Sequence, residues 1–134
     1  MKILVVDDEF VALQKMLVLL EPYGSCDAAT HGEQAYEMFR KALMGIHPYD
    51  LVTIDIDMPG MNGLMLLRRL REAEEAEAVP PARKLIVSAN ANSVNVTQAM
   101  LQRCDGFLVK PIRREALVHK LVDIGVIAPE RAAP

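Results

Sequence analysis

Residues 51–63 read LVTIDIDMPGMNG and combine a mostly apolar run, two acids and a tight turn. The run, residues 51–54, leads directly into Asp55 and Asp57, and a turn that contains proline and glycine follows. A short apolar run bounded by turn residues is typical of a buried strand in a parallel sheet. These residues therefore predict a central strand that carries carboxylates at its carboxyl end.

Three further apolar runs end in residues that suit phosphoryl chemistry, and segments of helical periodicity separate the four runs. Parallel strands point the same way, so the residues just past their ends gather along one edge of the sheet, where open α/β sheets place their sites. The sequence therefore predicts one site built from acids, a hydroxyl and an ammonium group. The residues that follow the three runs are Asp7 and Asp8 (run 3–6), Ser88 (run 85–87) and Lys110 (run 107–109).

The composition is that of one globular domain. The chain has 134 residues, of which 51% are hydrophobic and 25% charged, which is the profile of a soluble protein with a single core. A net charge of −3 offers no basic surface for nucleic acid, and no apolar run reaches the length of a membrane span. Met1 and Lys2 lead straight into a strand, so we expect no signal peptide. Cys26 and Cys104 lack metal-type spacing and are expected to be reduced thiols of a cytoplasmic protein.

Helical periodicity predicts an α/β protein of five strand–helix units. A weak strand over residues 25–29 suits the edge of the sheet. We expect one domain over residues 1–124, followed by a C-terminal tail or the start of a linker over residues 125–134. The expected helices cover residues 10–20, 35–43, a segment that begins at Gly63, residues 93–103 and a segment after Pro111.

Two of these helices carry side chains whose environment the sequence also predicts. On the third helix, Glu72, Glu74, Glu75 and Glu77 are expected in a solvated outer face, and two of them stand four residues after an arginine, a spacing that favours ion pairs. On the fourth helix, Met100 is expected to face the core.

Several carboxylates would lie in one small cleft, those of Asp7, Asp8, Asp55 and Asp57. Two such charges about 4 Å apart repel each other by roughly 4 kcal/mol at an effective dielectric constant near 20. A bound cation offsets this repulsion. Hard oxygen ligands favour Mg²⁺, Mn²⁺ or Ca²⁺, and a site with few carboxylates and free positions suits Mg²⁺.

Asp55 is the best candidate nucleophile, because it ends the central strand and carboxylates accept phosphoryl groups covalently. Lys110 supplies a point charge for a phosphoryl oxygen, and the hydroxyl of Ser88 can hydrogen-bond to another. Taken singly, these residues are also typical of a helix cap, a solvated lysine and a turn serine. Their shared position after strands favours a phosphoryl-transfer site.

The sequence carries five matching elements in a fixed order: Val6-Asp7-Asp8-Glu9, residues 29–35, Asp55-x-x-Met-Pro-x-Met-Asn-Gly63, Ser88-Ala89 and Asp105-Gly-Phe-Leu-Val-Lys-Pro111. In these elements the chain, over residues 1 to about 124, resembles the receiver domain of bacterial two-component response regulators, in particular the single-domain regulators of chemotaxis. Each motif is moderately specific, and their order and spacing together are strongly so. The resemblance implies a flavodoxin-like, doubly wound five-stranded parallel sheet in the order 2-1-3-4-5, with helices on both faces.

The resemblance implies that Asp55 accepts a phosphoryl group from a histidine kinase or a histidine phosphotransfer protein. The resulting aspartyl phosphate would be hydrolysed slowly by the protein itself, which is expected to be a signalling phosphoacceptor and not an enzyme. The side chains of Asp8 and Asp55 would bind Mg²⁺, together with Asp7 through water and Asp57 through its backbone carbonyl. Lys110 would pair with the phosphoryl group, and its peptide bond to the next residue would be cis.

A switch through Ser88 and Phe107 is implied as well. Once Asp55 is phosphorylated, Ser88 would move toward the new oxygen and Phe107 would turn inward, which alters the surface of the fourth helix, fifth strand and fifth helix for a downstream protein target. Many relatives carry threonine and tyrosine at these two positions, and a fixed core role for Phe107 stays equally open. We also hypothesise that Asn90 and Asp57 border the phosphoryl site and tune hydrolysis.

Two other functions match parts of the sequence, and a third, DNA binding, does not. Asp55 and Asp57 also match the Asp-x-Asp motif of haloacid-dehalogenase-like phosphatases, which carry it on the first strand and need a further acidic pair after the lysine. A docking module could keep the fold without phosphorylation, although all the acceptor-site residues are present. DNA binding lacks a basic stripe and a helix-turn-helix segment.

The histidines do not follow strands and are expected to be exposed or structural: His31, His47 and His119.

Overall fold

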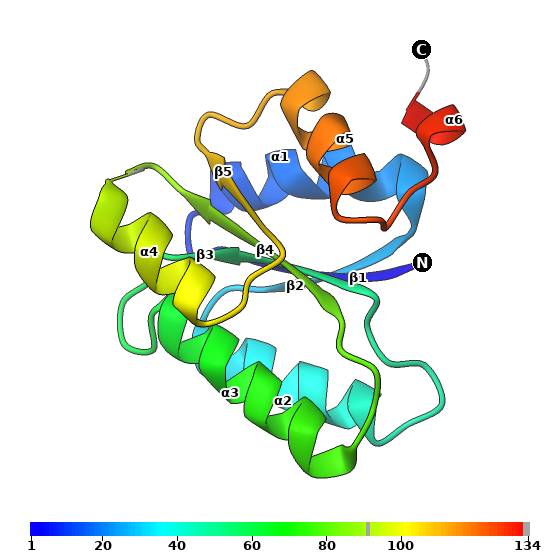
Figure 1. The fold of residues 1–134 in the computed structure, drawn as a ribbon, viewed down its shortest axis with the longest axis vertical. Coiled ribbons are helices and arrows are strands. Elements are labelled where there is room, and N and C mark those ends of the chain that lie inside the picture. The colour runs from blue at the N-terminus through cyan, green and yellow to red at the C-terminus, as the bar shows by residue number, and fades with distance from the viewer. Residues whose placement is uncertain (91, 133–134) are drawn as a thin grey trace.

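The computed structural model describes residues 1–90 and 92–132, which form a central sheet between two layers of helices (Figure 1). The strands are β1 (Lys2–Val6), β2 (Ser25–Ala29), β3 (Leu51–Asp55), β4 (Arg83–Ser88) and β5 (Gly106–Val109). The helices are α1 (Phe10–Leu20), α2 (Gly32–Leu43), α3 (Gly63–Glu77), α4 (Ser93–Leu101), α5 (Arg114–Asp123) and α6 (Pro129–Ala132), and a 3₁₀ turn, η1 (Glu21–Tyr23), follows α1.

The sheet has the predicted topology. Its strands are all parallel and lie in the order β2-β1-β3-β4-β5. β1 and β3 are neighbours, with Val6 opposite Ile54. The strand order reverses between them, because β2 lies on the outer side of β1 while β4 and β5 lie beyond β3. The flavodoxin-like, doubly wound sheet is therefore confirmed, and its topological switch point lies between β1 and β3.

The strands are apolar because helices cover both faces of the sheet. Ile3 and Val5 belong to a core cluster with residues of α1 and α5, whereas Leu4 and Val6 belong to a second cluster with residues of α2 and α3. In Figure 1, α1 and α5 lie above the sheet and α2 and α3 lie below it. Successive side chains of a strand point to opposite faces, so a core on both sides requires an uninterrupted apolar run.

The prediction of a solvated acidic face on α3 was wrong at Glu74. This side chain is buried, and its Oε1 lies 2.6 Å from Nζ of Lys84, which is buried on β4. Oε2 accepts the backbone N–H of Ala82 at 2.6 Å, and Nζ of Lys84 also donates to the carbonyl of Ala82 at 2.8 Å. A buried ion pair persists only where such additional bonds satisfy the remaining lone pairs and protons. The two predicted pairs on the exposed face of α3 are present, Arg68–Glu72 at 3.1 Å and Arg71–Glu75 at 3.3 Å.

The prediction that Met100 faces the core was also wrong. Ala99 is fully buried against the sheet, whereas Met100 is 63% exposed and Leu101 is 69% exposed. Each residue turns the helix by about 100°, so the neighbours of a single buried position point away from the core. The described C-terminal part of α4 therefore contacts the core through Ala99 and presents Met100 and Leu101 to solvent.

The C-terminal residues pack against α1 and η1. Ile127 is buried in the α1/α5 cluster, and Nη2 of Arg131 donates to the carbonyl of Pro22 at 2.9 Å. The guanidinium of Arg131 also lies 5.6 Å from the ring centre of Tyr23. The boundary expected near residue 124 remains a prediction.

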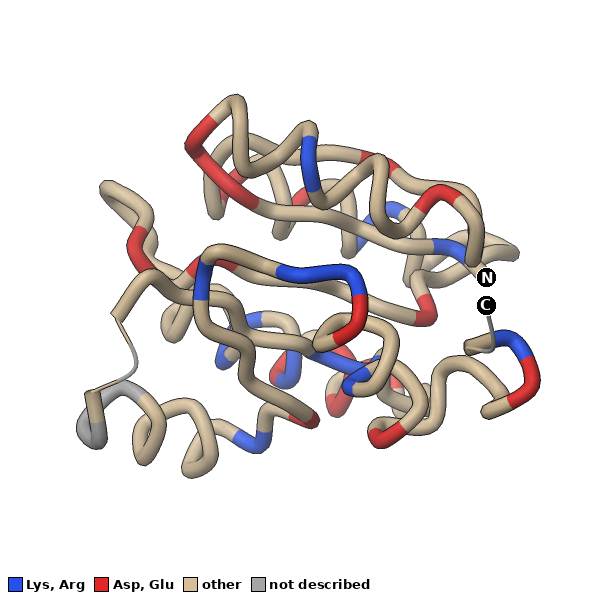
Figure 2. The backbone as a smooth tube through the Cα atoms, turned by 90° about the horizontal axis from the view of Figure 1, so that it is seen from above, with Lys and Arg blue, Asp and Glu red and all other residues tan. Residues whose placement is uncertain are grey.

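Charged residues of both signs are distributed over the described chain (Figure 2). Among the residues that the structure describes, no helix has the length and apolar character needed to cross a membrane. Cys26 and Cys104 are free thiols, and burial raises the pKa of both above the ordinary value.

Candidate functional site

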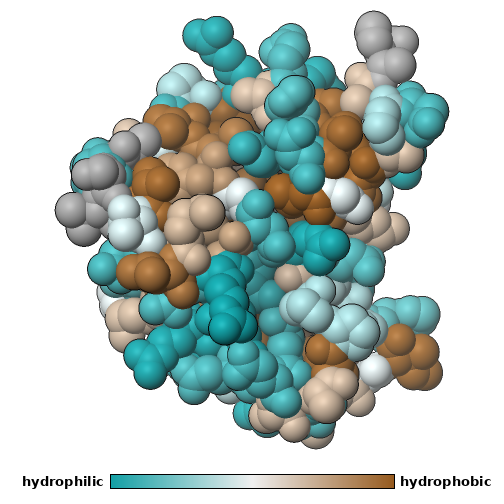
Figure 3. Space-filling view, viewed as in Figure 1, coloured by the Kyte–Doolittle hydropathy of each residue, from teal (hydrophilic) through white to brown (hydrophobic). Residues whose placement is uncertain are grey.

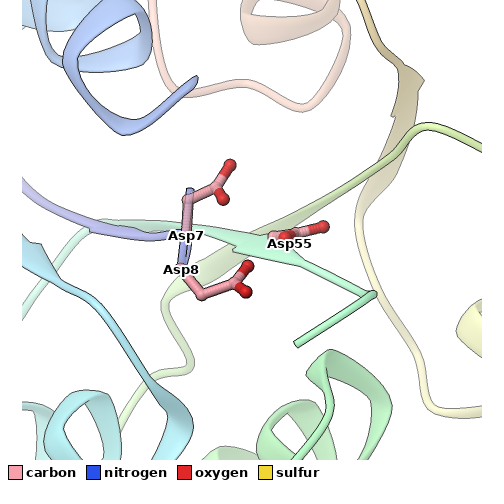
Figure 4. Close-up of side chains that lie close together, drawn as sticks. All are labelled: Asp7, Asp8 and Asp55. Atoms are coloured by element: carbon pink, nitrogen blue, oxygen red, sulfur yellow. The ribbon is translucent and has the colours of Figure 1, made fainter. Parts of the chain in front are cut away.

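The carboxyl ends of β1 and β3 bring three aspartates together (Figure 4). Asp7 and Asp8 follow β1, and Asp55 is the last residue of β3. One carboxylate oxygen from each lies within 4.8 Å of those from the other two. Asp7 and Asp55 are buried, whereas Asp8 is exposed, so the cluster opens to solvent on one side. Three hard oxygen donors at this spacing match the ligand chemistry of a small divalent cation.

Lys110 supplies the positive charge of the site. Its Nζ donates to Oδ2 of Asp7 at 3.0 Å and lies 3.7 Å from Oδ1 of Asp55. Burial lowers the pKa of Lys110, but the hydrogen bond to Asp7 and the charges of Asp55, Asp7 and Glu9 outweigh that effect, and the net pKa is raised. The ammonium group is therefore held in its charged form beside two buried carboxylates.

Asp55 has a strongly perturbed acidity. Burial and the charge of Asp7 raise its pKa to about 7, although the N–H of Asp57 and the charge of Lys110 act in the opposite direction. The backbone N–H of Asp57 donates to Oδ1 of Asp55 at 3.2 Å. A buried carboxylate with specific charged neighbours in a cleft is typical of a functional site.

The backbone around Asp55 is tightly packed. Gly63, the first residue of α3, donates its N–H to the carbonyl of Ile56 at 3.1 Å, and a Cβ at this position would lie 2.5 Å from the carbonyl oxygen of Asp55. Only glycine allows this approach of α3 to the end of β3. Asn62 then caps the helix, because its Oδ1 accepts the N–H of Met65 at 3.0 Å.

Ser88 is fully buried at the end of β4. Its Oγ lies within donating distance of two acceptors, Oδ2 of Asp57 and the carbonyl oxygen of Asn90, each at 3.0 Å. Oγ also accepts the backbone N–H of Asn90 at 3.0 Å. The side chain of Asp57 is thus directed to Ser88 and is not part of the three-aspartate cluster. Sequence reasoning missed this contact, because the loops after β3 and β4 set it and no residue spacing records how two loops approach each other.

Phe107 lies on β5 opposite Ile86 and is half-buried against the core cluster that includes Ala99 and Cys104. The Lys110–Pro111 peptide bond is cis, as the resemblance implied. A cavity of about 430 Å³ lies beside the acids, between Met16 of α1 and Ile112 of the segment that follows β5.

The histidines lie outside the acidic site, as predicted. His31 caps α2, since its Nδ1 accepts the N–H of Gln34 at 3.2 Å. His47 is exposed and binds Lys2 through its backbone carbonyl. His119 is exposed on α5, 3.5 Å from Asp123.

The fold and the site together define an open α/β protein with an acidic, lysine-bearing site at its topological switch point. Residues 3–122 match the family model of the response regulator receiver domain. The chain therefore belongs to the response regulator receiver family, as the motifs of the sequence indicated.

The family's chemotaxis regulators are among the similar proteins. Chemotaxis protein CheY of Treponema pallidum is 31% identical over 125 residues, which cover 92% of this chain and 81% of that protein. CheY of Borrelia burgdorferi, solved in a CheX-CheY-BeF3-Mg+2 complex, has a TM-score of 0.80 at 24% identity and 92% and 87% coverage. The receiver domain of the Arabidopsis thaliana histidine kinase CKI1, solved with Mg²⁺ and BeF3⁻, has a TM-score of 0.82 at 22% identity and 92% and 88% coverage.

Receiver domains act in two-component signal transduction as phosphoacceptors and not as classical enzymes. The haloacid-dehalogenase-like alternative, which the order of the motifs already disfavoured, therefore lacks support. The structure adds that the carboxylate of Asp57 accepts a hydrogen bond from Ser88.

Proposed function

We propose that Asp55 accepts a phosphoryl group from a histidine kinase or a histidine phosphotransfer protein in a Mg²⁺-dependent step. The observation that carries this proposal is the position of Asp55, a buried carboxylate at the switch point that clusters with Asp7 and Asp8 and has the ammonium of Lys110 at 3.7 Å. This arrangement places one nucleophile, one cation-binding set and one fixed positive charge around a single point.

In the proposed step, an oxygen of Asp55 forms a bond to phosphorus while the phosphorus–nitrogen bond of a phosphohistidine breaks. The electron pair of the broken bond stays on the imidazole nitrogen. Oδ1 of Asp55 is held by the N–H of Asp57, which fixes the orientation of the carboxylate before the step. Lys110 neutralises part of the charge on the transferring oxygens and is prepositioned to do so by its bond to Asp7.

The donor set fits Mg²⁺, with Asp8 and Asp55 as side-chain ligands, Asp7 through water and Asp57 through its backbone carbonyl. When bound, Mg²⁺ would neutralise the carboxylates and the charge of the transferring group. The B. burgdorferi and A. thaliana relatives were solved with Mg²⁺ and BeF3⁻, and trifluoroberyllate stands in for a phosphoryl group. These complexes support the same assignment for this chain.

The proposed output runs through Ser88 and Phe107. Ser88 would bond to the new phosphoryl group, and Phe107, which is half-buried, would move further into the core beside Ala99. The surface of α4, β5 and α5 would then change. Met100, Leu101 and Val109 are 63%, 69% and 46% exposed on α4 and β5. Apolar side chains at this surface (Figure 3) support contact with a downstream protein target.

The proposal makes the chain a cytoplasmic signalling protein that contacts donor and target proteins and neither nucleic acid nor membrane. Residues 1–124 would be the receiver domain, with residues 125–134 as a tail or the start of a linker. The aspartyl phosphate would be lost slowly by hydrolysis, at a rate tuned by Asp57 and Asn90 at the rim of the site.

The proposal is tested by intact mass spectrometry after incubation with Mg²⁺ and acetyl phosphate. The parent should gain one phosphoryl group that neutral hydroxylamine removes, and Asp55→Asn should gain none. Asp123→Asn, which removes an exposed carboxylate of α5 that is not part of the cluster, is the matched control and should behave like the parent. Equal uptake by the parent and Asp55→Asn would overturn the assignment.

A further inference from the structure

The side chain of Asp57 is the one carboxylate after β3 that the acidic cluster does not use. Its Oδ2 lies 3.0 Å from Oγ of Ser88, the residue in which β4 ends. Ser88 is fully buried, whereas Asp57 is exposed. The hydrogen bond therefore joins an exposed residue to a buried hydroxyl.

The hydroxyl of Ser88 has one proton and two acceptors at equal distance. Oδ2 of Asp57 and the carbonyl oxygen of Asn90 both lie 3.0 Å from Oγ. A hydrogen bond to an ionised acceptor is roughly twice as strong as a bond to a neutral one. The proton therefore belongs to Asp57, and Oγ remains free to accept the N–H of Asn90 at 3.0 Å.

Asp57 also contacts the proposed phosphoacceptor. Its backbone N–H donates to Oδ1 of Asp55 at 3.2 Å while its side chain holds Ser88. One residue thus joins the residue that would be phosphorylated to the residue that would respond. A phosphoryl group on Asp55 would compete with Asp57 for the single proton of Ser88, since both are anionic acceptors.

We propose that Asp57 is a positioning residue whose carboxylate holds the hydroxyl of Ser88, so that this hydrogen bond must be exchanged before Ser88 can bond to a phosphoryl group on Asp55. The exchange transfers no proton, because the hydroxyl only changes acceptors. The inference rests on the proposed function and adds to it a residue that sets how readily the switch responds. The exposure of Asp57 suits this role, because water can take over the released carboxylate.

The first test needs neither metal nor phosphoryl group. NMR three-bond couplings of Ser88 report the χ1 rotamer in the metal-free protein. The parent should show one dominant rotamer, Asp57→Asn a partly averaged coupling, and Asp57→Ala a clearly averaged one. The graded series is expected because the amide of asparagine still offers a neutral acceptor. An unchanged rotamer in Asp57→Ala would overturn the proposal.

The second test separates the hydrogen bond from the charge of Asp57. Trifluoroberyllate affinity in the presence of Mg²⁺ is measured for the parent, Asp57→Ala, Ser88→Ala and the double variant. Loss of a negative charge tightens anion binding in either background, whereas loss of the hydrogen bond matters only where Ser88 is present. Asp57→Ala should lower the dissociation constant of trifluoroberyllate by a factor that is roughly tenfold larger in the background with Ser88 than in the Ser88→Ala background.

Equal tightening in both backgrounds would show that Asp57 acts through charge alone and would overturn the proposal. Failure of the parent to bind trifluoroberyllate would count against the proposed function. The rotamer experiment would still decide whether Asp57 positions Ser88, so the two failures are distinguishable.

Discussion

Lys110 and Asp7 form an ion pair in which Nζ lies 3.0 Å from Oδ2. This pair joins the residue after β5 to the residue after β1, two strands that are not neighbours in the sheet. The ion pair therefore links the two strand ends at the site itself, and the ammonium group that Asp7 binds also lies 3.7 Å from Oδ1 of Asp55.

Lys110→Met should impair both stability and function. Two buried carboxylates would lose their cation, which costs about 1–3 kcal/mol in the free energy of unfolding of the metal-free protein. Phosphoryl uptake from acetyl phosphate should slow by at least about tenfold, because the transferring oxygens lose a fixed charge. Urea denaturation and time-resolved mass spectrometry measure the two effects. Lys41→Met, which breaks an exposed ion pair on α2, should change neither the stability nor the rate of phosphoryl uptake. Similar losses in Lys41→Met would contradict a specific role for Lys110.

Asp55→Asn should stabilise the metal-free protein. The raised pKa of Asp55, about 7 in the fold, means that burial opposes the ionised form. In the unfolded chain this group ionises at its ordinary pKa near 3.9. Its destabilising effect on the fold is therefore absent well below pH 4, grows as the pH rises and is complete above about pH 8. The gain of at least about 1 kcal/mol should therefore be larger at pH 8 than at pH 5. A pH-independent gain in urea titrations at the two pH values would contradict this account.

Mg²⁺ should stabilise the parent by binding to the acidic cluster of the folded protein, and the gain should rise with the logarithm of the Mg²⁺ concentration above the dissociation constant. At a concentration ten times the dissociation constant, the expected gain is about 1.4 kcal/mol. Asp8→Ala should lower this gain strongly, because Asp8 is the exposed carboxylate through which the cluster meets solvent. Thermal unfolding with and without Mg²⁺ measures the effect, with Ca²⁺ as a comparison. Full stabilisation of Asp8→Ala by Mg²⁺ would place the cation elsewhere.

Glu74→Ala should be among the most destabilising single substitutions on α3. It leaves the ammonium of Lys84 buried without its carboxylate and removes the acceptor for the N–H of Ala82, a loss of about 3–5 kcal/mol. Glu75→Ala, one residue further along, breaks only an exposed pair and should cost at most about 1 kcal/mol. Similar denaturation midpoints for the two variants would show that the buried pair contributes little.

The strands and the acidic site were predictable because they depend on local pattern. A strand buried on both faces must be apolar throughout, and parallel strands bring their carboxyl ends to one edge, so Asp7, Asp55 and Lys110 meet whatever the details of the helices. The cis bond before Pro111 followed only from the resemblance to the family.

The environments of three side chains could not be predicted, for a common reason: those of Glu74, Met100 and Asp57. Each environment depends on a contact between segments far apart in the chain: α3 with β4, α4 with the sheet, and the loop after β3 with Ser88. Periodicity identifies the apolar face of a helix, but a charged residue at its margin is buried only when a partner from another element reaches it. No spacing in the sequence records that partner.

The central claim, that Asp55 carries the phosphoryl group, is tested most directly by borohydride reduction followed by peptide mapping. The protein is incubated with Mg²⁺ and acetyl phosphate, unfolded and reduced, which converts an aspartyl phosphate to homoserine. The account predicts homoserine at position 55 alone. Homoserine at position 7, 8 or 57, or none in a protein whose intact mass shows a phosphoryl group, would contradict it.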